Sequence, residues 1–265
     1  MALIVLTSAA GSPGTTTTAV GLALSWPRPV LLVEADPTGG SPVLAGYFRG
    51  TITPSHGLID LALAHREGRL EEALPGTLLP IPGHDASLLP GVRGHVQARS
   101  LAAAWEPLAQ AFRGLHHTGQ DVIVDAGRLG LTGSPDALIK AADLALLAIR
   151  TDLVSLAAAR SWAEAQAEEF RAMGTCGSLG LLLVGEKRPY AAADVAKVMG
   201  LPIVASIAWD PAAAQVFSHG ATPPRRFEHG VLVRSLHAAR SAIQARLTAG
   251  CASVTPSPLA MEVPS

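Results

Sequence analysis

The chain has 265 residues, a formal net charge of -1 at pH 7, 49% hydrophobic residues and 4% aromatic residues. This length suits one α/β domain with a large core, and the near-neutral charge, without a basic run, argues against nucleic-acid binding. Two isolated cysteines, no signal-peptide pattern and no stretch of about 20 apolar residues predict a cytoplasmic protein without a membrane span.

Short apolar runs of strand length alternate with helical patterns along the chain. Such an alternation is typical of a buried, mostly parallel sheet with helices on both faces. We therefore predict a three-layer, doubly wound, mostly parallel α/β fold. Strands are expected at 3–7, 30–34, 122–124, 144–148, 179–184 and 203–207, and helices at 16–24, 58–66, 70–74, 95–115, 134–141, 153–173, 191–199, 211–218 and 230–249.

The chain divides into one predicted domain, residues 1–249, and a Pro/Ser-rich segment, 250–265, that is expected to be disordered. Residues 253–265 contain three prolines and no Lys or Arg. A basic amphipathic helix that lies on a membrane is therefore not expected at this end.

The stretch from Ser8 to Thr18, SAAGSPGTTTT, follows the first predicted strand and leads into the first predicted helix. It matches the phosphate-loop pattern G/A-x-x-x-x-G-K-[ST] at Ala9, Gly14 and Thr16, and departs from it at Thr15. Backbone N–H groups and the magnesium-binding hydroxyl are retained, but the lysine that neutralises phosphates is absent. The alternative for this stretch alone is an ordinary glycine-rich turn.

Two acidic residues follow buried strands of the predicted sheet. Asp36 comes after the strand at 30–34, and Asp125 after the strand at 122–124. Ligands of such sheets bind at the carboxyl ends of the strands, where carboxylates hold magnesium. Each residue alone also fits a turn or a cap, but together with the loop they favour a magnesium–nucleotide site.

Six segments follow one another along the chain: AGSPGTTT at 10–17, EADPTGG at 34–40, GLIDLAL at 57–63, LPGVRG at 89–94, DVIVD at 121–125 and IAWDP at 207–211. In this order they resemble the motifs of the deviant Walker A ATPases of the ParA/MinD type, which belong to the SIMIBI class and have the P-loop NTPase fold. In addition, RTDLVSLAAAR at 150–160 resembles the CpaE/TadZ relatives that place pilus and secretion machines.

The resemblance implies a role for each matching residue. It implies that Asp36 orients the attacking water and that Thr16, Asp36 and Asp125 hold Mg²⁺. It also implies a nucleotide contact by Gly11, Ser12, Pro13, Gly14, Thr15, Thr16, Thr17, Asp210 and Pro211.

The chain departs from the family at several of these positions. The family's two loop lysines, one acting within the chain and one across a dimer, correspond to Thr15 and Ala10. Glu34 replaces the first Asp of the D-x-D segment, and no adenine-contacting Asn is evident at 184–189. With these departures, the chain resembles a degenerate member of the ParA/MinD family.

The expected function follows from the absence of the loop lysine. Loss of one hydrogen bond to a charged group weakens binding by about 10- to 150-fold, and a missing cation slows phosphoryl transfer by on the order of 10³ to 10⁵. We therefore expect an inactive or very weak ATPase, with ATP or ADP and Mg²⁺ bound weakly or not at all. It would act as a homodimeric scaffold or localisation factor for a pilus, secretion or partition machine, recruited by a protein partner to the inner membrane face or a pole.

Two alternatives stay open. The first is an active ATP-dependent dimerisation switch in which Arg93, Arg128 or Arg150 replaces the lysine. The second is an ATP-dependent metabolic ligase of the same superfamily.

Overall fold

The computed structural model describes residues 1–10 and 12–252. Within them, one eight-stranded sheet has the order β3-β4-β2-β5-β1-β6-β7-β8, and every pair is parallel except β3 with β4. The predicted doubly wound, mostly parallel sheet is thereby confirmed. The strands are β1 (Leu3–Ser8), β2 (Val30–Glu34), β3 (Leu79–Pro80), β4 (Ala86–Leu89), β5 (Asp121–Arg128), β6 (Leu144–Arg150), β7 (Leu179–Val184) and β8 (Ile203–Ile207).

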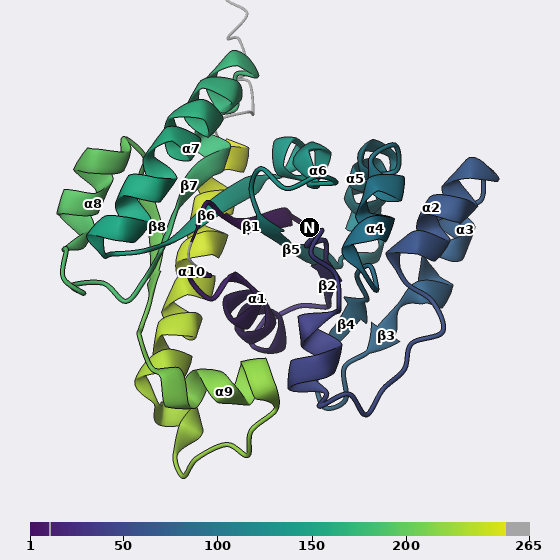
Figure 1. Cartoon of the computed structure of the whole chain (residues 1–265), viewed down its shortest axis with the longest axis horizontal. Helices are drawn as coiled ribbons and strands as arrows, with labels where there is room; N and C mark the ends of the chain where they lie inside the picture. Colours follow the sequence, from purple (N-terminus) through teal and green to yellow (C-terminus); the bar gives the residue numbers. More distant parts are fainter. Residues whose placement is uncertain (11, 253–265) are drawn as a thin grey trace, which may run out of the picture.

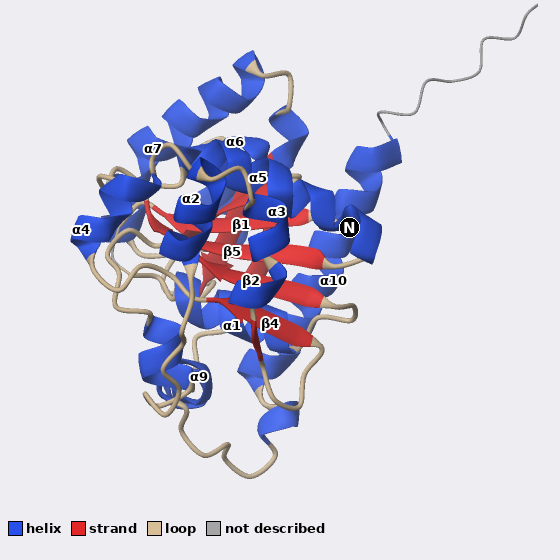
Figure 2. Cartoon of the chain, turned by 90° about the vertical axis from the view of Figure 1, so that its right-hand side faces the viewer, coloured by secondary structure: helices blue, strands red, loops and turns tan. Residues whose placement is uncertain are grey.

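Helices cover both faces of the sheet, as Figures 1 and 2 show. Side chains along β1 alternate between two cores: Leu3 and Val5 pack with α2, α5, α6 and α7, whereas Ile4 and Leu6 pack with α1, α9 and α10. The helices are α1 (Thr15–Leu24), α2 (Leu58–Arg66), α3 (Leu70–Ala73), α4 (His95–Ala98), α5 (Trp105–Gly114), α6 (Asp136–Ala141), α7 (Leu153–Ala172), α8 (Ala192–Met199), α9 (Pro211–His219) and α10 (Val231–Ala252), with a π-helical turn η1 (Val43–Tyr47) after β2.

Three expectations about the elements need correction. The region between α3 and α4 contains the strands β3 and β4, which were not predicted, and β4 pairs in parallel with β2. The helix expected at 95–115 is two helices, α4 and α5, separated by a 3₁₀ turn. The last helix continues to Ala252, three residues beyond its expected end, and the remaining predicted tail, 253–265, lies outside the described residues.

The amino end of β5 is fixed by Asp121, the first acidic residue of the DVIVD segment. Its fully buried carboxylate accepts hydrogen bonds from the Ala2 backbone N–H and the Trp26 Nε1–H, each at 2.7 Å, and pairs with Arg28 at 2.6 Å. These contacts satisfy a charge that would be costly to bury alone. Asp121 is therefore a structural anchor at the edge of the sheet opposite to Asp125.

Across the described residues, no helix combines the length and the apolar character needed to cross a membrane. The loops that follow β1, β2, β5 and β6 all emerge at the carboxyl edge of the sheet, because these strands are parallel neighbours. This edge is where doubly wound sheets bind ligands.

Candidate functional site

The loop between β1 and α1 has the backbone form of an anion site. Gly14 caps α1 with φ 100°, a left-handed conformation that favours glycine, and its carbonyl accepts the Thr18 N–H at 2.9 Å. The first N–H groups of a helix have no partner within the helix and attract anions. The first turn of α1 carries no acidic side chain that would compete with an anion. Gly11, expected to contact the nucleotide, lies outside the described residues.

Thr16 and Asp125 meet beside this loop, as the motif predicts. The Thr16 hydroxyl donates to Oδ2 of Asp125, and Oδ1 accepts the Gly127 N–H at 3.2 Å. Burial, together with a smaller contribution from the negative charge of Asp36, raises the pKa of Asp125 to about 7. A cation at this position would stabilise the ionised carboxylate.

Asp36 lies next to Asp125 because β2 pairs with β5. The Ala35 N–H donates to the Asp125 backbone oxygen at 2.8 Å, and Oδ1 of Asp36 accepts the backbone N–H and the hydroxyl of Thr38 at 2.8 and 2.7 Å. Its carboxylate packs against Gly127, where an added Cβ would lie 2.3 Å from Cγ of Asp36. The glycine at position 127 therefore makes room for the expected water-orienting carboxylate.

These groups fit a magnesium ion held partly by phosphate. Asp36, Asp125 and Glu34 border a space of about 10 Å³, roughly the room that one water molecule needs. No set of three or more His, Cys, Asp or Glu side chains among the described residues has metal-binding geometry by itself. Mg²⁺ commonly takes one or two protein ligands and completes its shell with phosphate and water, so Thr16 with Asp125 is a suitable pair.

Glu34 connects two of the loops that border the site. Its buried carboxylate accepts hydrogen bonds from the Ser41 hydroxyl, from the Val43 N–H at 2.9 Å and from the Gly91 N–H at 3.4 Å. Burial raises the pKa of Glu34. The residue that replaces the family's first Asp therefore joins the turn after β2 to the loop after β4.

A cavity of about 340 Å³ adjoins the loop on the side of β7 and β8. The Asp210 carboxylate caps α9 by accepting the Ala213 N–H at 3.0 Å, and Pro211 is the first residue of that helix. The volume is at the lower end of small-molecule sites. Six of the predicted nucleotide contacts line this cavity: Ser12, Pro13, Gly14, Thr17, Asp210 and Pro211.

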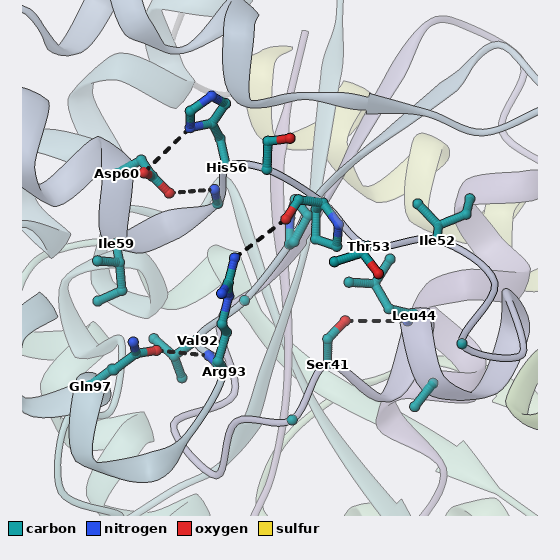
Figure 3. Close-up of a pocket in the computed structure, with 18 residues that line it drawn as sticks. Ser41, Leu44, Ile52, Thr53, His56, Ile59, Asp60, Val92, Arg93 and Gln97 are labelled. Carbon is teal, nitrogen blue, oxygen red and sulfur yellow. Dashed lines mark hydrogen bonds and ion pairs between the residues drawn. The ribbon is translucent and has the colours of Figure 1, made fainter.

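The three candidate arginines lie in different places. Arg93 belongs to a separate cavity of about 600 Å³, where its guanidinium reaches the Pro54 backbone oxygen at 3.4 Å (Figure 3). The Arg128 side chain is exposed at the end of β5. Arg150 contacts the phosphate loop, because its Nη2 donates to the Ser12 backbone oxygen at 3.0 Å.

Sequence reasoning missed Trp209. Its ring lies 4.7 Å from the Arg150 guanidinium and 5.7 Å from that of Arg188, and it lines the cavity of about 340 Å³. A tryptophan directly before Asp210 was a signal that the sequence offered, since few aromatic residues occur in this chain.

Several solved structures are similar to this chain in fold over nearly its whole length. MinD of Pyrococcus furiosus matches with a TM-score of 0.72 and 19% identity over 92% of this chain and 99% of that chain. The chain has the fold of MinD and ParA ATPases. A ParA family ATPase of Chlorobium tepidum matches the MinD/ParA fold of this chain with a TM-score of 0.69 and 18% identity, over 92% and 98% of the two chains. MinD of Pyrococcus horikoshii, solved with Mg-ADP, matches with a TM-score of 0.68 and 18% identity, over 96% and 100%.

Similarity in sequence leads to two proteins of Mycobacterium tuberculosis. The uncharacterized proteins Rv3660c of strain H37Rv and MT3760 of strain CDC 1551 are each 31% identical over 238 residues, which is 85% of this chain and 59% of the relative. The chain thus spans about three fifths of the length of these relatives. No protein-family model matches the chain.

Proposed function

We propose that this chain is a MinD/ParA-like protein with a weakened nucleotide site, which works as a dimeric scaffold or localisation factor. It binds ATP or ADP with Mg²⁺ weakly and hydrolyses ATP very slowly or not at all. Its partner is a protein of a pilus, secretion or partition machine, which recruits it to the inner membrane face or a pole.

The observation that carries this proposal is Thr15 at the first position of α1. Thr16 and Asp125 are joined by a hydrogen bond and Asp36 packs against Gly127 nearby, which supports a retained magnesium side of the site. The lysine that would neutralise the phosphates is replaced by a short, uncharged side chain. Weakened binding follows from the lost charge, and slow hydrolysis follows because phosphoryl transfer relies on electrostatic stabilisation.

A structure of similar fold favours another protein as the binding partner of this chain. One structure with a TM-score of 0.71 and 17% identity is a MinC–MinD cell division complex of Aquifex aeolicus, in which the MinD fold binds another protein. The chain has three lysines and a net charge of -1, which disfavours non-specific DNA binding. The CpaE/TadZ-like stretch 150–160 begins at Arg150, beside the phosphate loop, and supports a pilus or secretion machine as the partner system.

Two measurements on the full chain test the weakened site. Thermal-shift titration with ATP and Mg²⁺ is expected to give a small shift for the wild type and a larger one for Thr15→Lys, because the variant regains the cation. Robust magnesium-dependent ATP turnover by the wild type, abolished by Asp36→Ala, would contradict the proposal.

A second candidate is an ATP-driven dimerisation switch that uses an arginine in place of the lysine. The contact of Arg150 with the Ser12 backbone oxygen favours it. This candidate requires a dimer that forms only with ATP, as measured by light scattering after size-exclusion chromatography. A dimer that forms equally with and without ATP supports the scaffold instead.

A further inference from the structure

The guanidinium of Arg150 lies against a phosphate loop that carries no cation of its own. Arg150 ends β6, which pairs with β1 so that Ala148 lies beside Ser8. The Arg150 Nη2 donates to the Ser12 backbone oxygen at 3.0 Å, and the side chain lines the same cavity as Gly14. A positive charge therefore reaches the loop from the neighbouring strand.

This guanidinium is held in place but is incompletely hydrogen-bonded. It lies 4.7 Å from the ring of Trp209, and a guanidinium that stacks on a ring keeps its N–H groups available at its edge. Arginine has five N–H donors. The Arg150 Nε is buried without a hydrogen-bond acceptor, and Arg150 forms no ion pair with another side chain among the described residues. The unused donors suit a ligand with several anionic oxygens.

A second polar group of the loop also lacks a partner. The Thr15 side chain is buried, with 7% of its surface exposed, and its hydroxyl makes no hydrogen bond. Buried polar groups in native proteins usually have partners, so an unpaired one often marks the place of a missing ligand. Thr15 occupies the position of the phosphate-binding lysine, and Arg150 contacts the loop three residues before it.

We propose that Arg150 is the phosphate-binding cation of this site, in place of a lysine at position 15. Its N–H groups donate to the terminal phosphate oxygens of a nucleoside diphosphate or triphosphate, while the loop N–H groups hold the other oxygens. The inference rests on the proposed function, because it requires that the loop binds a nucleotide. It assigns the residual affinity for nucleotide to one side chain.

The test is isothermal titration calorimetry of the full chain with ATP, ADP and AMP in the presence of Mg²⁺. Arg150→Ala is expected to weaken ATP binding by about 10- to 150-fold, the worth of one hydrogen bond to a charged group. ADP binding weakens as well, and AMP binding changes little because AMP lacks the terminal phosphates. Arg188→Ala is the matched control, since Arg188 lies near the same Trp209 ring and does not line the cavity. It is expected to leave ATP affinity unchanged.

A second variant of Arg150 distinguishes a loss of ATP binding from a loss of folding. Arg150→Gln keeps an N–H donor and removes the charge, so it is expected to lose ATP affinity as Arg150→Ala does, with a melting temperature near that of the wild type. Equal ATP affinity in the wild type and both Arg150 variants overturns the inference and leaves the proposed function intact. Binding by Thr15→Lys but not by the wild type also overturns the inference; it removes the weak nucleotide binding from the proposed function and leaves the scaffold role in place. If neither the wild type nor Thr15→Lys binds ATP, both the inference and the weak-nucleotide proposal fail.

Discussion

The buried carboxyl of Asp125 couples the stability of this protein to pH. Its pKa rises from 3.8 to about 7 on folding, chiefly because of burial. Between these values the folded state binds more protons than the unfolded state, so the free energy of unfolding falls as pH rises. A shift of this size corresponds to at most about 4 kcal/mol. The stabilising contribution of the protonated Asp125 is fully lost once the pH is well above its pKa in the folded state.

Asp125→Asn is therefore expected to reduce this pH dependence. Asparagine keeps one oxygen that can accept the Thr16 hydroxyl, but it carries no charge. Urea unfolding without Mg²⁺ at about pH 5 and about pH 8 should show a smaller difference in the variant than in the wild type. A residual difference remains because burial also raises the pKa of Glu34. Equal pH dependence in both proteins would show that Asp125 ionises normally.

At the scale of elements, the carboxyl end of β5 and the turn after β2 are fitted to each other through a glycine. Gly127 has a φ of 64°, and an added Cβ would lie 2.3 Å from Cγ of Asp36 and 2.4 Å from its Oδ2. Gly83 has a similar φ of 79°, but an added Cβ there meets nothing within 4 Å. Substitution of alanine at Gly83 therefore tests backbone strain alone, whereas the same substitution at Gly127 tests backbone strain together with a steric clash with Asp36.

Gly83→Ala is expected to lower the free energy of unfolding by about 1 to 2 kcal/mol, the cost of a left-handed non-glycine residue. Gly127→Ala is expected to lower it further and to weaken the effect of ATP and Mg²⁺ on melting temperature, because Asp36 must move. Thermal unfolding with and without the ligands measures both effects. Identical behaviour of the two variants would mean that Asp36 tolerates displacement.

Local patterns were sufficient to predict most of the elements. The apolar run at 30–34 and the helix at 58–66 lie where expected, because the burial of each follows from its own residues. The strand β4 (Ala86–Leu89) was missed because it is only four residues long and because its parallel pairing with β2 joins segments that are far apart in the chain. The helix at 95–115 was predicted as continuous because its apolar residues recur across the 3₁₀ turn that divides it.

The site was predictable as far as its motifs reach. The loop and the two strand ends indicated that Thr16 would lie near Asp125, and these residues are joined by a hydrogen bond. The contacts of Arg150 were not predictable to the same degree, since they require β6 beside β1 and a stacked Trp209. The role of Glu34 was also hidden, because its partners come from loops after two different strands.

At the scale of the whole molecule, the carboxyl edge of the sheet gathers the groups that we propose to bind nucleotide and to form the homodimer. The α7 helix starts at this edge, directly after β6, and its first two residues, Leu153 and Val154, are 65% and 80% exposed. Contiguous exposed apolar patches mark surfaces that bind other proteins, and Leu153 and Val154 are adjacent exposed apolar residues on the helix that follows Arg150. We therefore place the proposed homodimer contact at the start of α7.

Val154→Asp is expected to abolish the proposed dimer and leave the folded monomer intact, because a charge at a mostly exposed position changes stability by about 0.5 kcal/mol or less. Val198→Asp is the control: Val198 is 51% exposed near the end of α8, the helix that leads into β8 and so ends at the opposite edge of the sheet. Light scattering after size-exclusion chromatography, with and without ATP and Mg²⁺, gives the mass of each variant. A dimer that survives Val154→Asp and is lost in Val198→Asp would move the contact to the opposite edge, away from the nucleotide, and would separate assembly from the phosphate loop.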